Sequence, residues 1–180
     1  MSIIGYLTAT EVEPSLFLGA AMSTDRFGLP AEFRYTEPVR ATRLQRILYG
    51  SALHRYLCRE VIASTLLQAM ETNPQVWIVQ EELLLEPLEA MRAPVVMLLP
   101  SEAAPMDDLG ATLPVGEDEM LVQLSLAGAP LRVRFGDTDP ERRQHAIQVL
   151  TEAAHTMDLL EPLHRLQQAL RVVQEEQEAA

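Results

Sequence analysis

The chain has 180 residues, a formal net charge of −12, and 48% hydrophobic and 22% charged residues. This length and composition are those of one ordinary globular domain with a sizeable core. A pI near 4.7 argues against wholesale binding of nucleic acid or anionic membranes, because the long-range field repels polyanions. All the cationic charge is arginine, which excludes a mechanism through a lysine Schiff base.

The sequence predicts a cytoplasmic location. Cys58 is the only cysteine, so no internal disulfide is possible and nothing points to secretion. The first ten residues lack the basic start and apolar run of a signal peptide, and no apolar stretch approaches the ~20 residues needed to span a bilayer.

Three strands are predicted in the first 36 residues. Residues 3–8 are apolar and rich in strand formers, and residues 11–14 are expected to break that strand. Residues 16–22 and 31–36 then predict a hairpin, since the second arm alternates apolar and polar side chains.

A helical pattern broken once follows this hairpin. Thr42 is predicted as an N-cap, and Gln45 completes a capping box with it. Gly50 is expected to break the helix with a positive φ, and apolar spacing predicts a second helix over residues 53–70.

Two short apolar runs, residues 76–79 and 95–99, predict strands covered on both faces. Residues 81–92 between them have helical composition, which predicts a βαβ unit with parallel strands. Residues 101–119 are rich in Pro, Gly and acids and predict a mobile acidic surface loop.

The last third predicts a second hairpin and two helices. Residues 120–126 and 131–135 alternate around a turn. Asp139 is the predicted N-cap of one helix, and the last helix is expected to begin close to Pro162 and to fray over residues 174–180.

These elements predict an α+β fold in a single domain over residues 1–180. Two hairpins and a βαβ unit would form one mixed β-sheet, packed by helices and closed by a C-terminal helical pair. In element order, without any motif, the chain resembles small signalling and scaffold domains of the roadblock or profilin-like kind.

The arginine-rich segment from Arg34 to Arg59 is the best positive signal for function. It holds six arginines and one acid, although the chain as a whole is strongly acidic. One interpretation is a binding site for an anionic ligand, with tyrosines available for stacking, and the other is pairing with surplus acids elsewhere. The candidate residues are Arg34, Arg40, Arg43, Arg46, Arg55, Arg59, Tyr35 and Tyr49.

The last helix carries an apolar stripe with spacings of 4, 3, 4 and 3 residues. This spacing suits a coiled-coil seam, but it extends over only about two heptads. Docking on the chain's own core is favoured, and antiparallel pairing with a second subunit is the alternative. The candidate interface residues are Leu159, Leu163, Leu166, Leu170 and Val173.

No catalytic motif is present in the sequence. It has no phosphate-binding glycine loop and no nucleophile elbow, and one cysteine with four scattered histidines matches no zinc spacing. We therefore expect no metal, no cofactor and no catalytic residue. A hydrolase or transferase using His54 or Asp137 is the least favoured hypothesis.

The resulting prediction is a non-enzymatic assembly or interaction protein of the bacterial-type cytoplasmic kind, with homo-oligomerisation as one form of assembly. Its expected partner is another protein or a second copy, with nucleic acid unlikely and no membrane. The alternative is a binding domain for an anionic ligand, nucleotide-like or nucleic acid, using residues 34–59.

Overall fold

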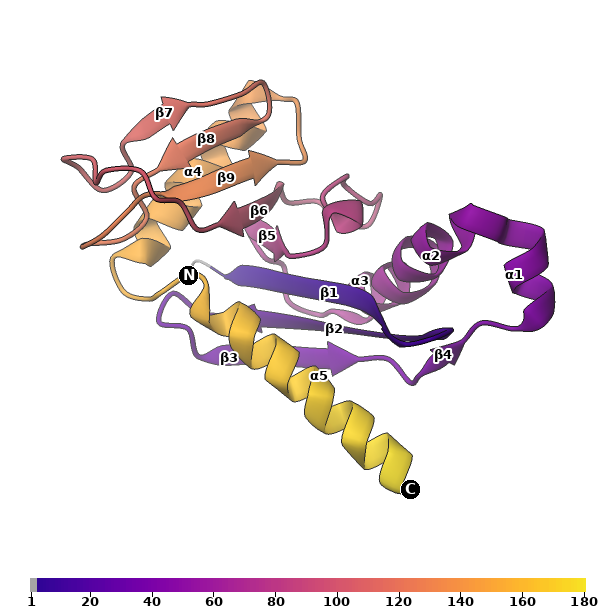
Figure 1. Cartoon of the computed structure of the whole chain (residues 1–180). Helices are drawn as coiled ribbons and strands as arrows, with labels where there is room; N and C mark the ends of the chain where they lie inside the picture. The colour runs from indigo at the N-terminus through magenta and orange to yellow at the C-terminus, as the bar shows by residue number, and fades with distance from the viewer. Residues whose placement is uncertain (1–2) are drawn as a thin grey trace.

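One mixed sheet of nine strands runs through the computed structural model, which describes residues 3–180 (Figure 1). Along the sheet the order is β3 (Pro30–Tyr35), β2 (Leu16–Thr24), β1 (Ile4–Glu13), β5 (Val76–Val79), β6 (Val95–Leu99), β9 (Leu131–Phe135), β8 (Glu119–Val122) and β7 (Thr112–Pro114), and β4 (Val39–Arg40) pairs with the start of β2. The predicted α+β class is confirmed.

The centre of the sheet is parallel and its flanks are antiparallel. Strands β1, β5 and β6 run parallel, with Leu7 opposite Val79 and Val79 opposite Met97. The predicted parallel pair is confirmed, but the helix expected over residues 81–92 is wrong. That segment holds one 3₁₀ turn, η3 (Glu82–Leu84), and irregular turns, because Pro87 interrupts helical hydrogen bonding.

Strand β1 is longer than its sequence suggests. It pairs with β2 from Ile4 opposite Thr24 to Glu13 opposite Leu16, through the segment expected to break it. The chain reverses at Ser15, whose φ of 65° is positive, the one non-glycine case in residues 3–180. The predicted hairpin of β2 and β3 is present.

Five short helical segments form a continuous arm after β4: α1 (Arg43–Tyr49), η1 (Gly50–Ala52), α2 (Leu53–Arg55), η2 (Tyr56–Ala63) and α3 (Ser64–Ala69). The capping box of Thr42 and Gln45 is present, with Gln45 N donating to Thr42 Oγ1 over 3.1 Å. Gly50 has the expected positive φ of 52°. Segment η2 is a π-helix, which the sequence did not suggest.

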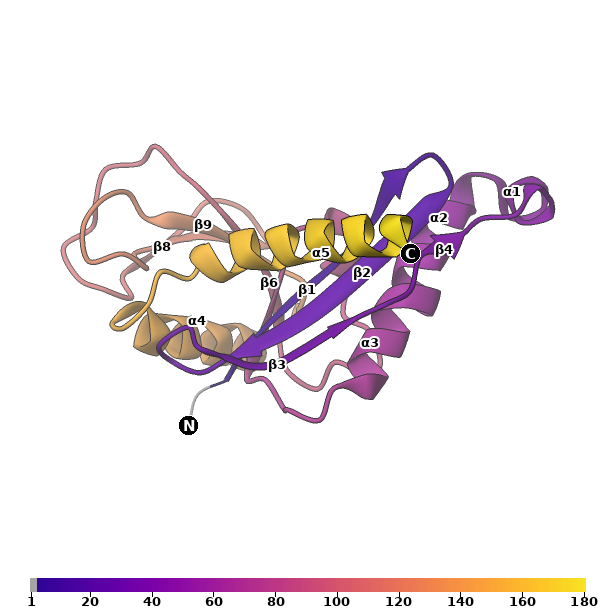
Figure 2. The ribbon, with the colours of Figure 1, turned by 90° about the horizontal axis from the view of Figure 1, so that it is seen from below.

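Helices cover both faces of the sheet, so the core has two halves (Figure 2). Helices α4 (Pro140–Ala154) and α5 (Glu161–Ala179) lie on one face, and α2, η2 and α3 lie on the other. Helix α4 begins at the predicted N-cap, Asp139, whose side chain accepts from Glu141 N.

The apolar stripe of α5 is buried on the chain's own sheet. Leu159, Leu163, Leu166, Leu170 and Val173 all belong to the core. In this structure the last helix docks on the chain's own sheet, and its apolar side chains are buried there. Helix α5 continues to Ala179, and Gln174 Nε2 donates to both Glu13 and Glu178; fraying of residues 174–180 stays a prediction.

The segment predicted as an acidic loop, residues 101–119, is instead partly built into the sheet. It contains β7 and the first residue of β8, and two of its acids, Asp118 and Glu119, form ion pairs. Asp118 pairs with Arg143, and Glu119 pairs with Arg132 at 2.7 Å. Across residues 3–180, no helix is both long and apolar enough to cross a membrane.

Candidate nucleic-acid interface

Helix α1 projects from one end of the sheet and buries none of its residues (Figures 1 and 2). Its apolar side chains Leu44, Ile47 and Leu48 are 64%, 69% and 70% exposed. Arg43 and Arg46 lie on the same short helix. The helix thus presents apolar and cationic groups together to solvent.

The turn between β1 and β2 holds α1 in place. Ser15 accepts a hydrogen bond at its carbonyl from Ala41 N over 2.8 Å. Its hydroxyl oxygen accepts another from Arg46 Nη1 over 3.1 Å. These two hydrogen bonds therefore fix the position of α1, and of its arginines, relative to the turn that follows β1.

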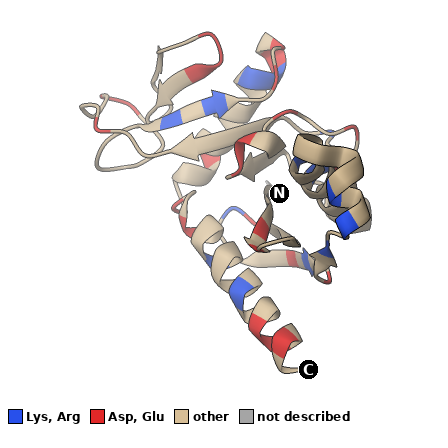
Figure 3. Ribbon diagram, turned by 45° about the vertical axis from the view of Figure 1, so that its right-hand side comes forward, with Lys and Arg blue, Asp and Glu red and all other residues tan. Residues whose placement is uncertain are grey.

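Two of the six arginines of the segment form ion pairs, and the other four do not. Arg34 pairs with Glu32 at 2.9 Å, and Arg55 pairs with Glu86. Arg40, Arg43, Arg46 and Arg59 form no ion pair with any residue among 3–180, and neither do three arginines outside the segment. Pairing with surplus acids thus explains only part of the cluster, and Figure 3 shows the positive residues on this arm.

Arg34 and Arg40 line one cleft of about 780 Å³ between residues 34–40 and the helical residues 61–69. Val61 and Ile62 supply its apolar wall. We call Arg34, Arg40, Arg43 and Arg46 the arginine surface. It comprises two arginines that line this cleft and two on the projecting helix α1.

Arg55 and Arg59 do not contribute to this surface. Arg59 is buried in the π-helix η2, and its Nη1 donates to the carbonyl oxygens of Leu83 and Glu86 over 2.7 and 2.8 Å. Burial, with the neighbouring Arg55, lowers the pKa of Arg59. This arginine stabilises the irregular connection between β5 and β6.

The two predicted tyrosines occupy different environments. Tyr35 is 52% exposed on β3, and its ring lies 5.8 Å from that of Phe33. Tyr49 stacks on Tyr56 with ring centroids 4.5 Å apart, so one of its faces is already covered. Tyr35 is therefore the better placed to contact a ligand.

A cavity of about 380 Å³ at the carboxyl ends of β1 and β5 was missed by sequence reasoning. Thr8, Thr10 and Glu81 line it from the sheet, and Arg171 lines it from α5. Thr8 Oγ1 donates to a Glu81 carboxylate oxygen, and burial raises the pKa of Glu81. The rule that ligands bind outside the carboxyl ends of parallel strands could have found it.

Glu81 is the sole carboxylate among the described residues that line this cavity. Within residues 3–180, no group of three or more His, Cys, Asp or Glu side chains could hold a metal ion. The cavity offers hydroxyl, amide, carboxyl and guanidinium groups for hydrogen bonding.

The other chemistry-bearing residues have structural partners. Asp137 accepts from Val95 N at 3.0 Å and from Arg142 Nε at 2.5 Å. The ring of His54 lies edge-on to Phe17, with centroids 5.6 Å apart. Burial raises the pKa of Cys58 to about 12, so its thiolate is scarce at neutral pH.

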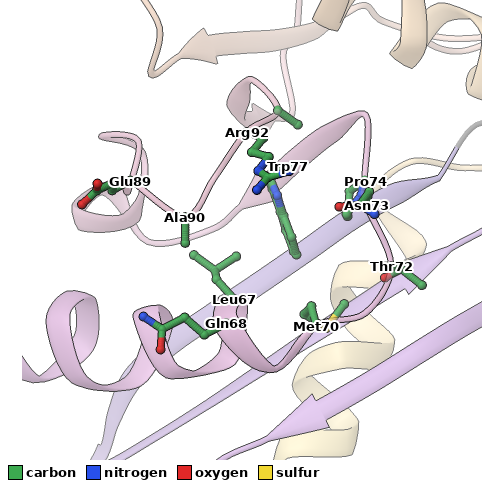
Figure 4. A pocket seen from close by; sticks show the side chains of 11 residues that line it. Leu67, Gln68, Met70, Thr72, Asn73, Pro74, Trp77, Glu89, Ala90 and Arg92 are labelled. Carbon is green, nitrogen blue, oxygen red and sulfur yellow. The ribbon is translucent and has the colours of Figure 1, made fainter.

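A second cleft, of about 620 Å³, lies at the amino ends of β5 and β6 (Figure 4). Leu67, Met70 and Trp77 give it an apolar wall, and Glu89 and Arg92 are its charged residues. With one acid and one arginine, this cleft lacks the cationic character of the arginine surface.

The fold is similar to that of endonuclease V in solved structures. The enzyme from Streptomyces avermitilis is 14% identical with a TM-score of 0.64, covering 97% of this chain and 82% of that chain. The catalytic domain of human endonuclease V is 14% identical with a TM-score of 0.62, over 99% and 84% of the two chains. The Ciona intestinalis enzyme, in complex with a 24mer DNA containing an inosine followed by a ribo-adenosine, is 11% identical with a TM-score of 0.61, over 97% and 87%.

No protein-family model matches the sequence, and no curated protein matches it. At these identities the structural likeness establishes the fold. Element order alone suggested the roadblock or profilin-like kind, but the chain has the endonuclease V fold instead.

This likeness overturns three predictions made from the sequence. The prediction of a non-enzymatic assembly protein is contradicted, because the similar structures are those of endonuclease V, which in two cases is in complex with DNA. Protein–protein interaction and homo-oligomerisation gain no support from them. Nucleic acid as an unlikely partner is also wrong, since relatives by fold are crystallised on DNA. The acidic pI does not exclude nucleic acid as a partner, because net charge says nothing about a local cationic surface.

Proposed function

We propose that this chain binds nucleic acid through the arginine surface, and that it does so in the cytoplasm. The observation that carries the proposal is that Arg40 on β4 and Arg43 and Arg46 on the adjoining, projecting helix α1 form no ion pair among the described residues (Figure 1). Further support comes from the endonuclease V fold, which binds DNA in the Ciona intestinalis enzyme.

The charge distribution sets the salt dependence of binding. At physiological ionic strength charges are screened beyond about 8 Å, so the surplus acids elsewhere act weakly on a strand held at the arginine surface. If four arginines each contact one phosphate, the logarithm of the association constant falls with log salt at a slope of about −3 to −4 for duplex DNA. Binding is therefore expected at low salt and is reduced steeply as salt rises.

Fluorescence anisotropy with labelled single- and double-stranded oligonucleotides tests the proposal. The double variant Arg43→Glu/Arg46→Glu is expected to lose binding at least 100-fold, roughly the loss of two phosphate contacts and the gain of two repulsions. Its melting temperature should stay close to that of the wild type, because neither side chain is buried.

Arg92→Glu is the matched control, because it changes the net charge by as much as Arg43→Glu does but lies outside the arginine surface. Arg92 is exposed, has no ion pair among residues 3–180, and lies at the opposite end of the sheet. If this single variant weakens binding as strongly as Arg43→Glu alone, the overall charge would account for the effect and the arginine surface would be the wrong site.

A second candidate function is cleavage of the bound nucleic acid at the cavity of Glu81. The favouring observation is a buried carboxyl group, hydrogen-bonded to Thr8, at the carboxyl ends of two parallel strands. Its raised pKa keeps more of Glu81 protonated, and a protonated carboxyl group donates to a leaving oxygen.

Incubation of end-labelled oligonucleotides with the protein between pH 5 and pH 8 tests this second candidate. Cleavage that Glu81→Gln removes, with binding unchanged, would support it. Intact oligonucleotides with the wild-type protein across that range would contradict it, while the binding proposal would stand on its own assay.

A further inference from the structure

The edge strand β3 and the loop before it expose an unusual amount of aromatic and apolar surface. Phe33 is 37% exposed and Tyr35 is 52% exposed, while Phe27 and Leu29 in the preceding loop are 54% and 63% exposed. Strand β2, which β3 pairs with, is buried throughout. Large exposed apolar surface that is contiguous along one element marks a binding surface.

The two aromatic side chains of β3 project from the face of the sheet that α5 covers. Register places Phe33 opposite Met22 and Tyr35 opposite Ala20, and both of these partners belong to the core half beneath α4 and α5. Arg34 lies between them in sequence and projects to the other face, where it lines the cleft with Arg40.

Strand β3 forms one edge of the sheet, and it pairs with β2 alone among the described strands. Its outer backbone groups are therefore not hydrogen-bonded to another strand. The edge carries two aromatic rings on one face and, on the other, Arg34, which is held by Glu32 and Glu71, so an extended ligand lying along it would meet both kinds of contact.

We propose that a single strand of nucleic acid lies along β3, with its bases stacked on Phe33 and Tyr35. Its phosphates contact Arg34 and Arg40, and the strand continues onto the arginine surface at α1. This inference rests on the proposed function and specifies the form of nucleic acid bound. Aromatic platforms combined with a cationic track are the means by which proteins hold single strands without reading their sequence.

Charge and geometry favour a single strand over the other extended ligands. Residues 26–46 hold five arginines and two acids, so the surface attracts polyanions in a chain that is otherwise acidic. In a duplex the base faces are covered by neighbouring base pairs, so they are not available to Phe33 and Tyr35. An extended peptide would use the strand edge without needing the two rings.

Tryptophan fluorescence can report the stacking directly. The chain has one tryptophan, Trp77, which is buried and supplies a constant background. In the variant Tyr35→Trp, addition of a single-stranded oligothymidylate is expected to quench the new emission. The matched variant Leu113→Trp places the reporter at an exposed position on β7, the opposite edge of the sheet, and no quenching is expected there.

Affinity measurements give the second readout. Tyr35→Ala should weaken binding of the single strand about 10-fold, the loss expected for one stacked base. Phe33→Ala should have a similar effect, and neither change should weaken duplex binding more than about 2-fold, since stacking is not used there.

The outcomes separate this inference from the proposed function. Binding to the wild-type protein that Arg43→Glu removes, without quenching in Tyr35→Trp, would overturn the β3 path and leave the proposed function intact. No binding of any oligonucleotide to the wild-type protein would overturn both. Equal quenching by polyglutamate would show contact with any polyanion and would overturn the stacking.

Discussion

Arg46 donates a hydrogen bond from Nη1 to the hydroxyl oxygen of Ser15 over 3.1 Å. This contact ties a cation of α1 to the turn at the carboxyl end of β1, where the backbone of Ser15 has a φ of 65°. The position of the arginine surface thus depends on a turn residue that is 31 positions away in the sequence.

Ser15→Gly removes the hydroxyl group that accepts from Arg46 and leaves the turn itself in place. Glycine adopts a positive φ without strain, so the free energy of unfolding should change by less than about 0.5 kcal/mol. The salt-dependent affinity for nucleic acid should fall by about 2- to 5-fold, because Arg46 loses a hydrogen-bond partner worth about 1 kcal/mol at most. Urea unfolding and anisotropy on the same preparation measure the two quantities, and a large loss of stability would refute this account of the turn.

Gly50→Ala should destabilise the protein by about 1–2 kcal/mol, because its φ of 52° lies in a region that L side chains rarely adopt. A Cβ there would meet no atom within 4 Å, so the cost comes from the backbone alone. Gly116→Ala is the control, since its Cβ also has room and its φ is ordinary. Chemical denaturation that ranks the two variants equally would contradict the explanation.

We expect the free energy of unfolding to fall in acid as the carboxylate of Glu32 becomes protonated. Partial burial favours a higher pKa, but hydrogen bonds from Thr72 N, Glu71 N and Arg34 outweigh it and lower the pKa of Glu32 to about 2. A group whose folded pKa is depressed stabilises the fold above its unfolded pKa, near 4.5, and this contribution is lost as pH falls from there towards 2.

Glu32→Gln should therefore lower the free energy of unfolding at pH 7 by about 1–2 kcal/mol, the usual value of hydrogen bonds to a charged group. The difference from the wild type should shrink between pH 4.5 and pH 2 in denaturation curves. A difference that stays constant over that range would mean that the charge of Glu32 contributes nothing.

Leu166→Glu should unfold the chain or destabilise it by at least about 4 kcal/mol, because it leaves an unpaired charge in the core. Leu166 is 1% exposed, on the side of α5 that packs on the sheet. Val172→Glu, on the exposed side of the same helix, should cost no more than about 0.5 kcal/mol. Circular dichroism melting curves compare the two, and a folded Leu166→Glu monomer would show that α5 is not part of the core.

Local signals in the sequence determined most of the regular elements. The capping box at Thr42, the positive φ at Gly50, the N-cap at Asp139 and the two hairpins were predicted because each depends on residues close in the chain. The parallel pairing of residues 76–79 with 95–99 followed from two buried runs joined by a long connection.

Tertiary structure alone decided the extent of β1, the irregular connection after β5 and the site. Composition favoured a helix over residues 81–92, but Leu84, Leu85 and Leu88 reach the core from turns that Arg59 holds through two carbonyl groups. Propensity is a weak force, and buried hydrogen bonds with packing override it.

The arginines show the same division most clearly. Their number and spacing were visible in the sequence, but their partners were not, because Glu71 and Glu86 lie more than 30 residues from the arginines they bind. Ion pairing acts through space over a few ångströms, so only the folded chain separated Arg34 and Arg55 from Arg40, Arg43 and Arg46. The sequence thus determined that cations were gathered in one segment, and the fold decided which of them face solvent without a partner.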